Sequence, residues 1–179
     1  ADLEYEVIGP QPEWCLGPDY LLLRSAITDY ASTDPPWRET PKRAIVTMGG
    51  SDTTGRTPVV VRAFDGFDLR VDVIVGPGFS AEQEAAIEIA AESIQADTRI
   101  VRDPDDLPKR MFQSDFAVTT ASTTTYELLA LGTPTICLPR CDSPIRTRHS
   151  TPSKATRSRT PTGRWTRCLS RLRENSFIQ

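Results

Sequence analysis

The sequence predicts an α/β fold with a Rossmann-like, doubly wound parallel sheet over residues 43–139. Short apolar, β-branched runs alternate there with segments that carry helix start and stop signals. The connections between them are short, which favours parallel strands joined by right-handed helical crossovers. Two of the apolar runs also end directly in clusters of Gly, Ser and Thr, the pattern typical of strand-to-helix turns in such sheets.

Five strands are expected, at 44–48, 70–75, 99–102, 116–119 and 135–138. The first, Ala-Ile-Val-Thr-Met, lacks the polar alternation of a half-exposed strand and therefore predicts a strand buried on both faces. Cys137 lies in the last run, and we expect it to be a small core residue.

Helices are expected at 58–64, after Ser80, at 105–114 and at 124–131. Ser80 with Gln83 three residues later has the spacing of a capping box. Gly132 and Pro134 are the stop signals of the last helix.

The two ends of the chain differ from this centre. Residues 1–42 are punctuated by proline, and we expect an irregular lead-in from a missing N-terminal domain. Residues 140–179 hold ten Lys or Arg side chains against two carboxylates, whereas residues 1–139 hold eleven against twenty-two. The front is therefore acidic, and the basic, low-complexity tail is expected to be disordered because it has little apolar surface to bury. A shifted reading frame and a nucleic-acid-binding tail are the two explanations for its composition.

Composition excludes several classes of function. His149 is the one histidine and lies in the tail, and the four cysteines lack metal-ligand spacing, so neither a zinc site nor a Ser-His-Asp triad is expected in the acidic domain. No apolar run approaches the ~18 residues of a membrane span, and no signal peptide opens the sequence, so a cytoplasmic location is expected. The acidic domain would repel nucleic acid.

The first candidate binding segment is the run Gly49, Gly50, Ser51 and Asp52, directly after the first strand. Glycines there allow a sharp turn and a close approach of the backbone to a ligand. Ser51 and Asp52 are expected either to bind a hydroxyl group or to cap the following helix.

The second candidate segment follows the fourth strand and comprises Ser122, Thr123, Thr124 and Thr125, with Glu127 close behind. Four hydroxyls and the free N–H groups of a helix start would form a cradle for a diphosphate without a lysine. Glu127 would repel phosphate, but its carboxylate suits a ribose diol. The alternative is structural: Thr123 or Thr124 caps the helix, and Glu127 completes a capping box.

Three motifs together resemble one family. They are Gly-Pro-x-Tyr-x-x-Leu-Arg at 17–24, Val-Thr-Met-Gly-Gly-Ser-Asp at 46–52 and Thr-Thr-Tyr-Glu-Leu-Leu-Ala-Leu-Gly-Thr-Pro-Thr-Ile at 124–136. The layout is similar to the UDP-sugar hydrolases of pseudaminic acid biosynthesis and the related spore-coat polysaccharide proteins, relatives of MurG-like glycosyltransferases with the GT-B fold. The resemblance covers about residues 17–139 and corresponds to the C-terminal, nucleotide-binding half of that fold.

The resemblance implies binding of UDP or a UDP-sugar, with no metal or cofactor. By position, Gly49, Gly50, Ser51, Thr124 and Thr125 would approach the diphosphate, and the glutamate that ends the Thr-Thr-x-Glu motif would hold the ribose. Catalysis in the family relies on a glycine-rich loop and a histidine of an N-terminal domain, so no catalytic residue is expected in this chain.

The sequence also departs from the family in two places. Ala121-Ser122 stands where a Gly-Gly pair is usual, and an Asn-Gln pair after the fifth strand is absent from 140–144. Two interpretations follow. The chain is the nucleotide-binding half of a UDP-sugar hydrolase or glycosyltransferase, or it is a non-enzymatic product, either an inactive fragment or a binding module with an anion-binding tail.

Overall fold

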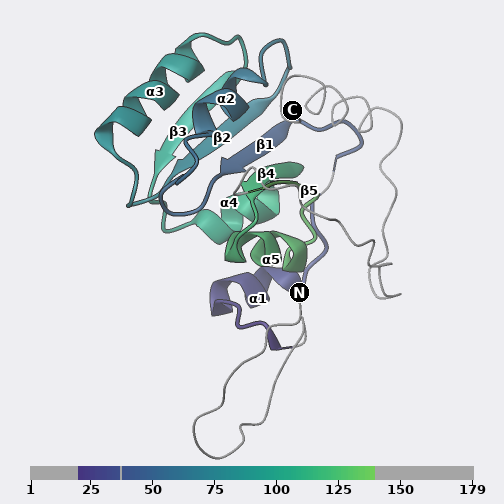
Figure 1. Ribbon diagram of the computed structural model, residues 1–179. Coiled ribbons are helices and arrows are strands. Elements are labelled where there is room, and N and C mark those ends of the chain that lie inside the picture. The colour runs from purple at the N-terminus through teal and green to yellow at the C-terminus, as the bar shows by residue number, and fades with distance from the viewer. Residues whose placement is uncertain (1–19, 37, 140–179) are drawn as a thin grey trace, which may run out of the picture.

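The computed structural model describes residues 20–36 and 38–139 and shows the α/β fold that the sequence predicts (Figure 1). Five parallel strands form one sheet in the order β3-β2-β1-β4-β5. The strands are β1 (Arg43–Thr47), β2 (Arg70–Val75), β3 (Asp97–Arg102), β4 (Phe116–Thr120) and β5 (Thr135–Leu138). The helices are α1 (Ser25–Ala31), α2 (Thr57–Arg62), α3 (Ala81–Glu92), α4 (Leu107–Gln113) and α5 (Thr123–Ala130).

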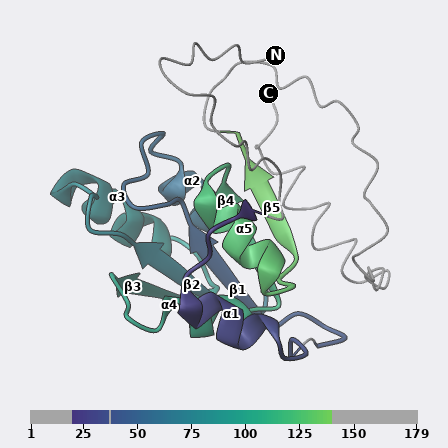
Figure 2. The same cartoon turned by 90° about the horizontal axis from the view of Figure 1, so that it is seen from below.

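Helices cover both faces of the sheet (Figures 1 and 2). On β1, Val46 belongs to the apolar cluster beneath α2 and α3, and Ile45 belongs to the cluster beneath α1, α4 and α5. Adjacent residues thus point to opposite, equally apolar layers, which explains why the strand sequence shows no polar alternation.

The helix signals in the sequence are confirmed where they are strongest. Ser80 Oγ accepts from the Gln83 backbone N–H at 3.2 Å, and the Ser80 N–H donates to Gln83 Oε1 at 2.8 Å. Gly132, with φ +69°, follows the last residues of α5 in the left-handed conformation that ends many helices.

Two expectations were wrong. Residues 25–31 form a helix inside the lead-in that was expected to be irregular, and Ile27 is fully buried against α4 and α5. Cys137 is exposed, because β5 is an edge strand and its side chain does not reach the core. The expectations for residues 1–19 and for the tail 140–179 lie outside the described residues. Within the described ranges, no helix is long and apolar enough to cross a membrane.

Candidate functional site

A cavity of about 290 Å³ opens at the carboxyl ends of β1 and β4. These strands are neighbours, but the chain leaves β1 toward β2 and leaves β4 toward β5, in opposite directions along the sheet. The two loops therefore diverge and leave a crevice, as at the ligand-binding switch points of other open α/β sheets. The lining residues are Met48, Gly49, Gly50, Ser51, Thr53, Thr120, Ser122, Thr123 and Thr124.

The structure thus brings together six of the nine residues that the sequence singled out. They come from segments about seventy residues apart in the chain and from both predicted loops. Asp52, Thr125 and Glu127 are not among the lining residues.

The first wall of the cavity follows β1 and contains two adjacent glycines, Gly49 and Gly50. Gly49 has φ +76°, a backbone conformation that residues other than glycine rarely adopt. A Cβ atom built on Gly49 or Gly50 would meet no atom within 4 Å. The space beside these glycines is therefore open, and a ligand could approach the peptide groups directly.

A second glycine loop supports this wall from behind. A Cβ atom on Gly76, just after β2, would lie 2.6 Å from the carbonyl oxygen of Gly50. The N–H of Gly78 donates to that same oxygen at 2.9 Å. The two loops consequently pack backbone to backbone, and Gly76 is required for their contact.

Gln83 also fixes the first wall. Besides capping α3, its Nε2 donates to the carbonyl oxygens of Ser51 at 3.3 Å and Asp52 at 3.0 Å. The sequence identified Gln83 as a helix cap, but its second role depends on a contact between residues about thirty positions apart.

Asp52 accepts hydrogen bonds from the loop that precedes α2 and from the start of that helix. It is 2% exposed and has φ +37°. Its Oδ2 accepts from both the N–H and the hydroxyl of Thr57 at 2.7 Å, and its Oδ1 accepts from Arg56 N and Thr54 Oγ1 at 3.2 Å. The N-cap residue of α2 is Arg56, but Asp52 accepts from the backbone N–H groups of Arg56 and Thr57 at the helix start, which is close to the capping role expected for it.

The second wall is the start of α5. Ser122 is the N-cap residue, so the structural alternative with Thr123 or Thr124 as the cap was wrong. The N–H groups of Thr123 and Thr124 are in the first turn and have no acceptor within the helix. Together with the positive end of the helix dipole, they favour an anion in the cavity.

Ser122 and Thr125 have the capping-box arrangement, and the Ser122 N–H donates to Thr125 Oγ1 at 3.5 Å, but the Ser122 side chain makes no cap hydrogen bond. The Oγ atom is buried and has no hydrogen-bond partner among the described residues. A buried hydroxyl without a partner costs free energy, so such atoms in native proteins usually meet a water or a ligand. Thr125 instead turns inward, where its hydroxyl donates to the carbonyl oxygen of Thr120 at 3.2 Å.

Glu127 lies beyond the first turn of α5 and is held by Arg24. Arg24 Nε donates to Oε1 at 2.8 Å, and its Nη2 donates to Oε2 at 3.1 Å. Glu127 therefore does not complete a capping box. Arg24 is the last residue of the Gly-Pro-x-Tyr-x-x-Leu-Arg motif, and the sequence alone does not reveal its partner.

None of the described residues that line the cavity has a charged side chain. An anion there would be recognised by peptide N–H groups, hydroxyls and the helix dipole, and no carboxylate would repel it. Within the described parts of the chain, no group of three or more His, Cys, Asp or Glu residues is placed to hold a metal ion.

Comparison with known proteins gives a distant relative but no family. No family model matches the chain. An uncharacterized protein of Methanocaldococcus jannaschii is 28% identical over 127 residues, which cover 68% of this chain and 26% of that protein. The chain therefore spans about a quarter of the length of this relative.

Proposed function

We propose that the cavity binds the diphosphate of UDP or of a UDP-sugar, and that the chain is the nucleotide-binding half of a GT-B-type UDP-sugar hydrolase or glycosyltransferase. The observation that carries the proposal is the meeting of the Gly49–Gly50 backbone with the start of α5 in one uncharged cavity at the β1–β4 switch point. Surface polysaccharide or nonulosonic acid biosynthesis is the process that the motif resemblance suggests.

The size of the cavity is consistent with a diphosphate and not with a whole nucleotide sugar. Small-molecule sites commonly measure ~300–1000 Å³, and about 290 Å³ lies at the lower limit. The nucleoside and the sugar would extend past the rim, where a second domain would close over them. In this arrangement catalytic groups come from the facing domain, and this chain contributes binding and orientation.

The start of α5 would also assist the reaction. When the bond between the sugar and UDP breaks, negative charge collects on the departing diphosphate. The N–H groups of Thr123 and Thr124 and the unused hydroxyl of Ser122 are preorganised donors for this charge. No movement of a lysine or arginine into the cavity is needed.

Glu127 can take part without releasing Arg24. Each carboxylate oxygen has two lone pairs, and each accepts one bond from Arg24. One acceptor position on each oxygen remains, which suits the two hydroxyls of a ribose. Arg24 would then orient the carboxylate instead of competing with the sugar.

Calorimetric titration with UDP, uridine and inorganic phosphate tests the proposal. UDP should bind more tightly than either part alone, because it alone joins the cavity to the Glu127 carboxylate. Replacing Ser122 by Ala should weaken UDP binding about tenfold, which corresponds to ~1.4 kcal/mol.

Ser93→Ala is the matched control, because Ser93 caps the far end of α3. Equal binding of UDP and uridine, or equal affinities of the Ser122→Ala and Ser93→Ala variants, would refute a diphosphate site at α5.

A further inference from the structure

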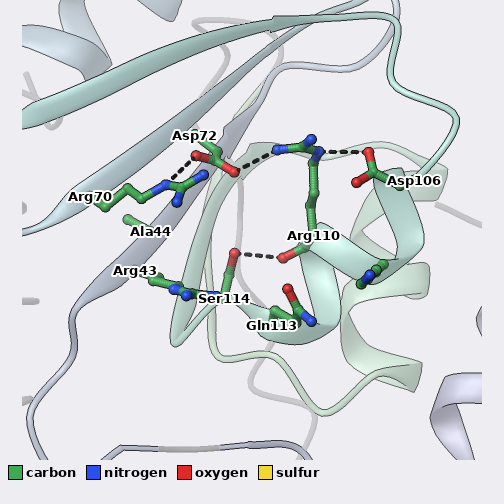
Figure 3. A pocket seen from close by; sticks show the side chains of 9 residues that line it. Arg43, Ala44, Arg70, Asp72, Asp106, Arg110, Gln113 and Ser114 are labelled. Carbon is green, nitrogen blue, oxygen red and sulfur yellow. Dashed lines mark hydrogen bonds and ion pairs between the residues drawn. The ribbon is translucent and has the colours of Figure 1, made fainter.

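A second cavity of about 280 Å³ lies at the opposite end of the sheet, beside the amino ends of β1 and β2 and against α4. Its basic side chains are Arg43, Arg70 and Arg110 (Figure 3), together with Lys109. Residues 1–139 contain only eleven Lys or Arg residues, so four of the eleven gather at this one cavity of an otherwise acidic domain.

Two carboxylates hold two of the four basic side chains in place but do not cancel the positive charge of all four. Asp72 lies between two guanidinium groups, accepting from Arg70 Nε at 3.1 Å and from Arg110 Nη1 at 3.0 Å (Figure 3). Asp106 accepts from Arg110 Nε at 2.7 Å. These bonds fix the planes of both arginines and leave further N–H donors on each.

Arg43 and Lys109 are not paired in this way. Neither side chain forms a hydrogen bond or an ion pair with any other residue in the described part of the chain, yet both line the cavity. Four cations and two carboxylates leave a formal charge of +2 at this cavity. The carboxyl end of α4 opposes an anion, but a helix dipole amounts to only about half a charge at its end.

We propose that this cavity is a second ligand site, separate from the nucleotide cavity, and that it binds a dianionic phosphate group, either free or as a small phosphomonoester. Guanidinium groups match phosphate oxygens with paired N–H donors, and Lys109 supplies a movable point charge. A charge of about −1.5 to −2, typical of a phosphomonoester near pH 7, complements the excess positive charge at the cavity. The small size of the cavity and its polar walls suit a compact anion.

Titration followed by backbone amide NMR shifts tests this site on the intact chain. Inorganic phosphate and glycerol 3-phosphate are added separately, and the amides of Ala44, Gln113 and Ser114 report on the second cavity. The amides of Gly50 and Thr123 report on the nucleotide cavity in the same spectra. We expect saturable shifts in the first group, and the probe that binds more tightly identifies the source of the phosphate group.

The double variant Arg43→Gln/Lys109→Gln should weaken this binding at least tenfold without unfolding the protein, because both residues are exposed and neither side chain forms a hydrogen bond or an ion pair within the described residues. Arg62→Gln is the control, an exposed cation on α2 and therefore on the other face of the sheet. Saturable shifts that the double variant abolishes and the control retains support the site.

Absence of saturable shifts at Ala44, Gln113 and Ser114 overturns the proposal, as does equal weakening by all the variants, which would indicate diffuse electrostatic attraction. Shifts confined to Gly50 and Thr123 also overturn it while supporting the nucleotide cavity. The two proposals can therefore fail independently.

Discussion

Arg24 and Glu127 form a two-point ion pair between residues 103 positions apart in the chain, with distances of 2.8 and 3.1 Å. Arg24 precedes α1, and Glu127 lies in α5. The pair links the lead-in segment to the helix whose start forms one wall of the cavity at the β1–β4 switch point.

Glu127→Gln should weaken UDP binding about tenfold, or ~1.4 kcal/mol, because the amide nitrogen can neither accept from the ribose nor pair with Arg24. The free energy of unfolding should change by less than ~1 kcal/mol, because Arg24 is about half exposed and such pairs contribute little. Calorimetry and urea denaturation measure the two quantities.

Glu88→Gln provides the control, since it breaks an exposed Arg–Glu pair with Arg102 on the far side of the molecule. Equal UDP affinities for Glu127→Gln and Glu88→Gln would show that Glu127 does not bind the ribose.

Gly50→Ala and Gly76→Ala should have opposite effects. A methyl group on Gly50 enters open space, so the protein should remain as stable as the wild type but lose UDP affinity. A methyl group on Gly76 would lie 2.6 Å from the Gly50 carbonyl oxygen, so this variant should lose ~1–3 kcal/mol of stability. Thermal melts and UDP titrations of both variants test the pair, and a stable Gly50→Ala variant with full affinity would contradict a ligand beside Gly50.

The strands and the two loops that line the cavity could be predicted from the sequence, because both depend on local patterns. Buried β-branched runs marked the strands, and clusters of Gly, Ser and Thr marked the turns that follow β1 and β4. Parallel pairing then places those turns at the same edge of the sheet, whatever the other strands do.

Helix α1, the exposure of Cys137 and the basic cavity could not be predicted from the sequence, because they depend on contacts between residues far apart in the chain. Helix α1 has no capping side chain and only seven residues, so its stability comes from packing on α4 and α5, which no local pattern reveals. Cys137 was placed in the core because an apolar run does not show which strand lies at the sheet edge. The basic cavity draws side chains from β1, β2 and α4, and no motif in the sequence connects them.

Asp52→Asn should destabilise the protein by ~2 kcal/mol. Both carboxylate oxygens accept hydrogen bonds in a buried position, so an amide nitrogen would face a donor on either side. Asp103→Asn is a matched control, because Asp103 has the same φ of +37° but is exposed. Urea denaturation should show a loss only for Asp52→Asn, and equal stabilities would mean that its bonds to the start of α2 contribute nothing.

Asp115→Ala should lower the free energy of unfolding by ~3 kcal/mol or more. The Asp115 side chain is fully buried and accepts from Arg38 Nη1 at 3.0 and 3.1 Å and from the N–H groups of Lys42 and Arg43 at 2.8 and 2.9 Å. Its removal leaves these donors unpaired where the chain enters β1. Denaturation measures the loss, and a change below ~1 kcal/mol would show that water replaces the carboxylate.

The most direct test of the account is a titration of the isotope-labelled chain with UDP, followed through its backbone amide NMR shifts. A diphosphate site at the β1–β4 switch point predicts saturable shifts at Gly49, Gly50, Ser51, Thr123 and Thr124, with Ala44 and Ser114 unchanged. Shifts that are absent, or that fall mainly around Ala44 and Ser114, would contradict the nucleotide-binding role of this cavity.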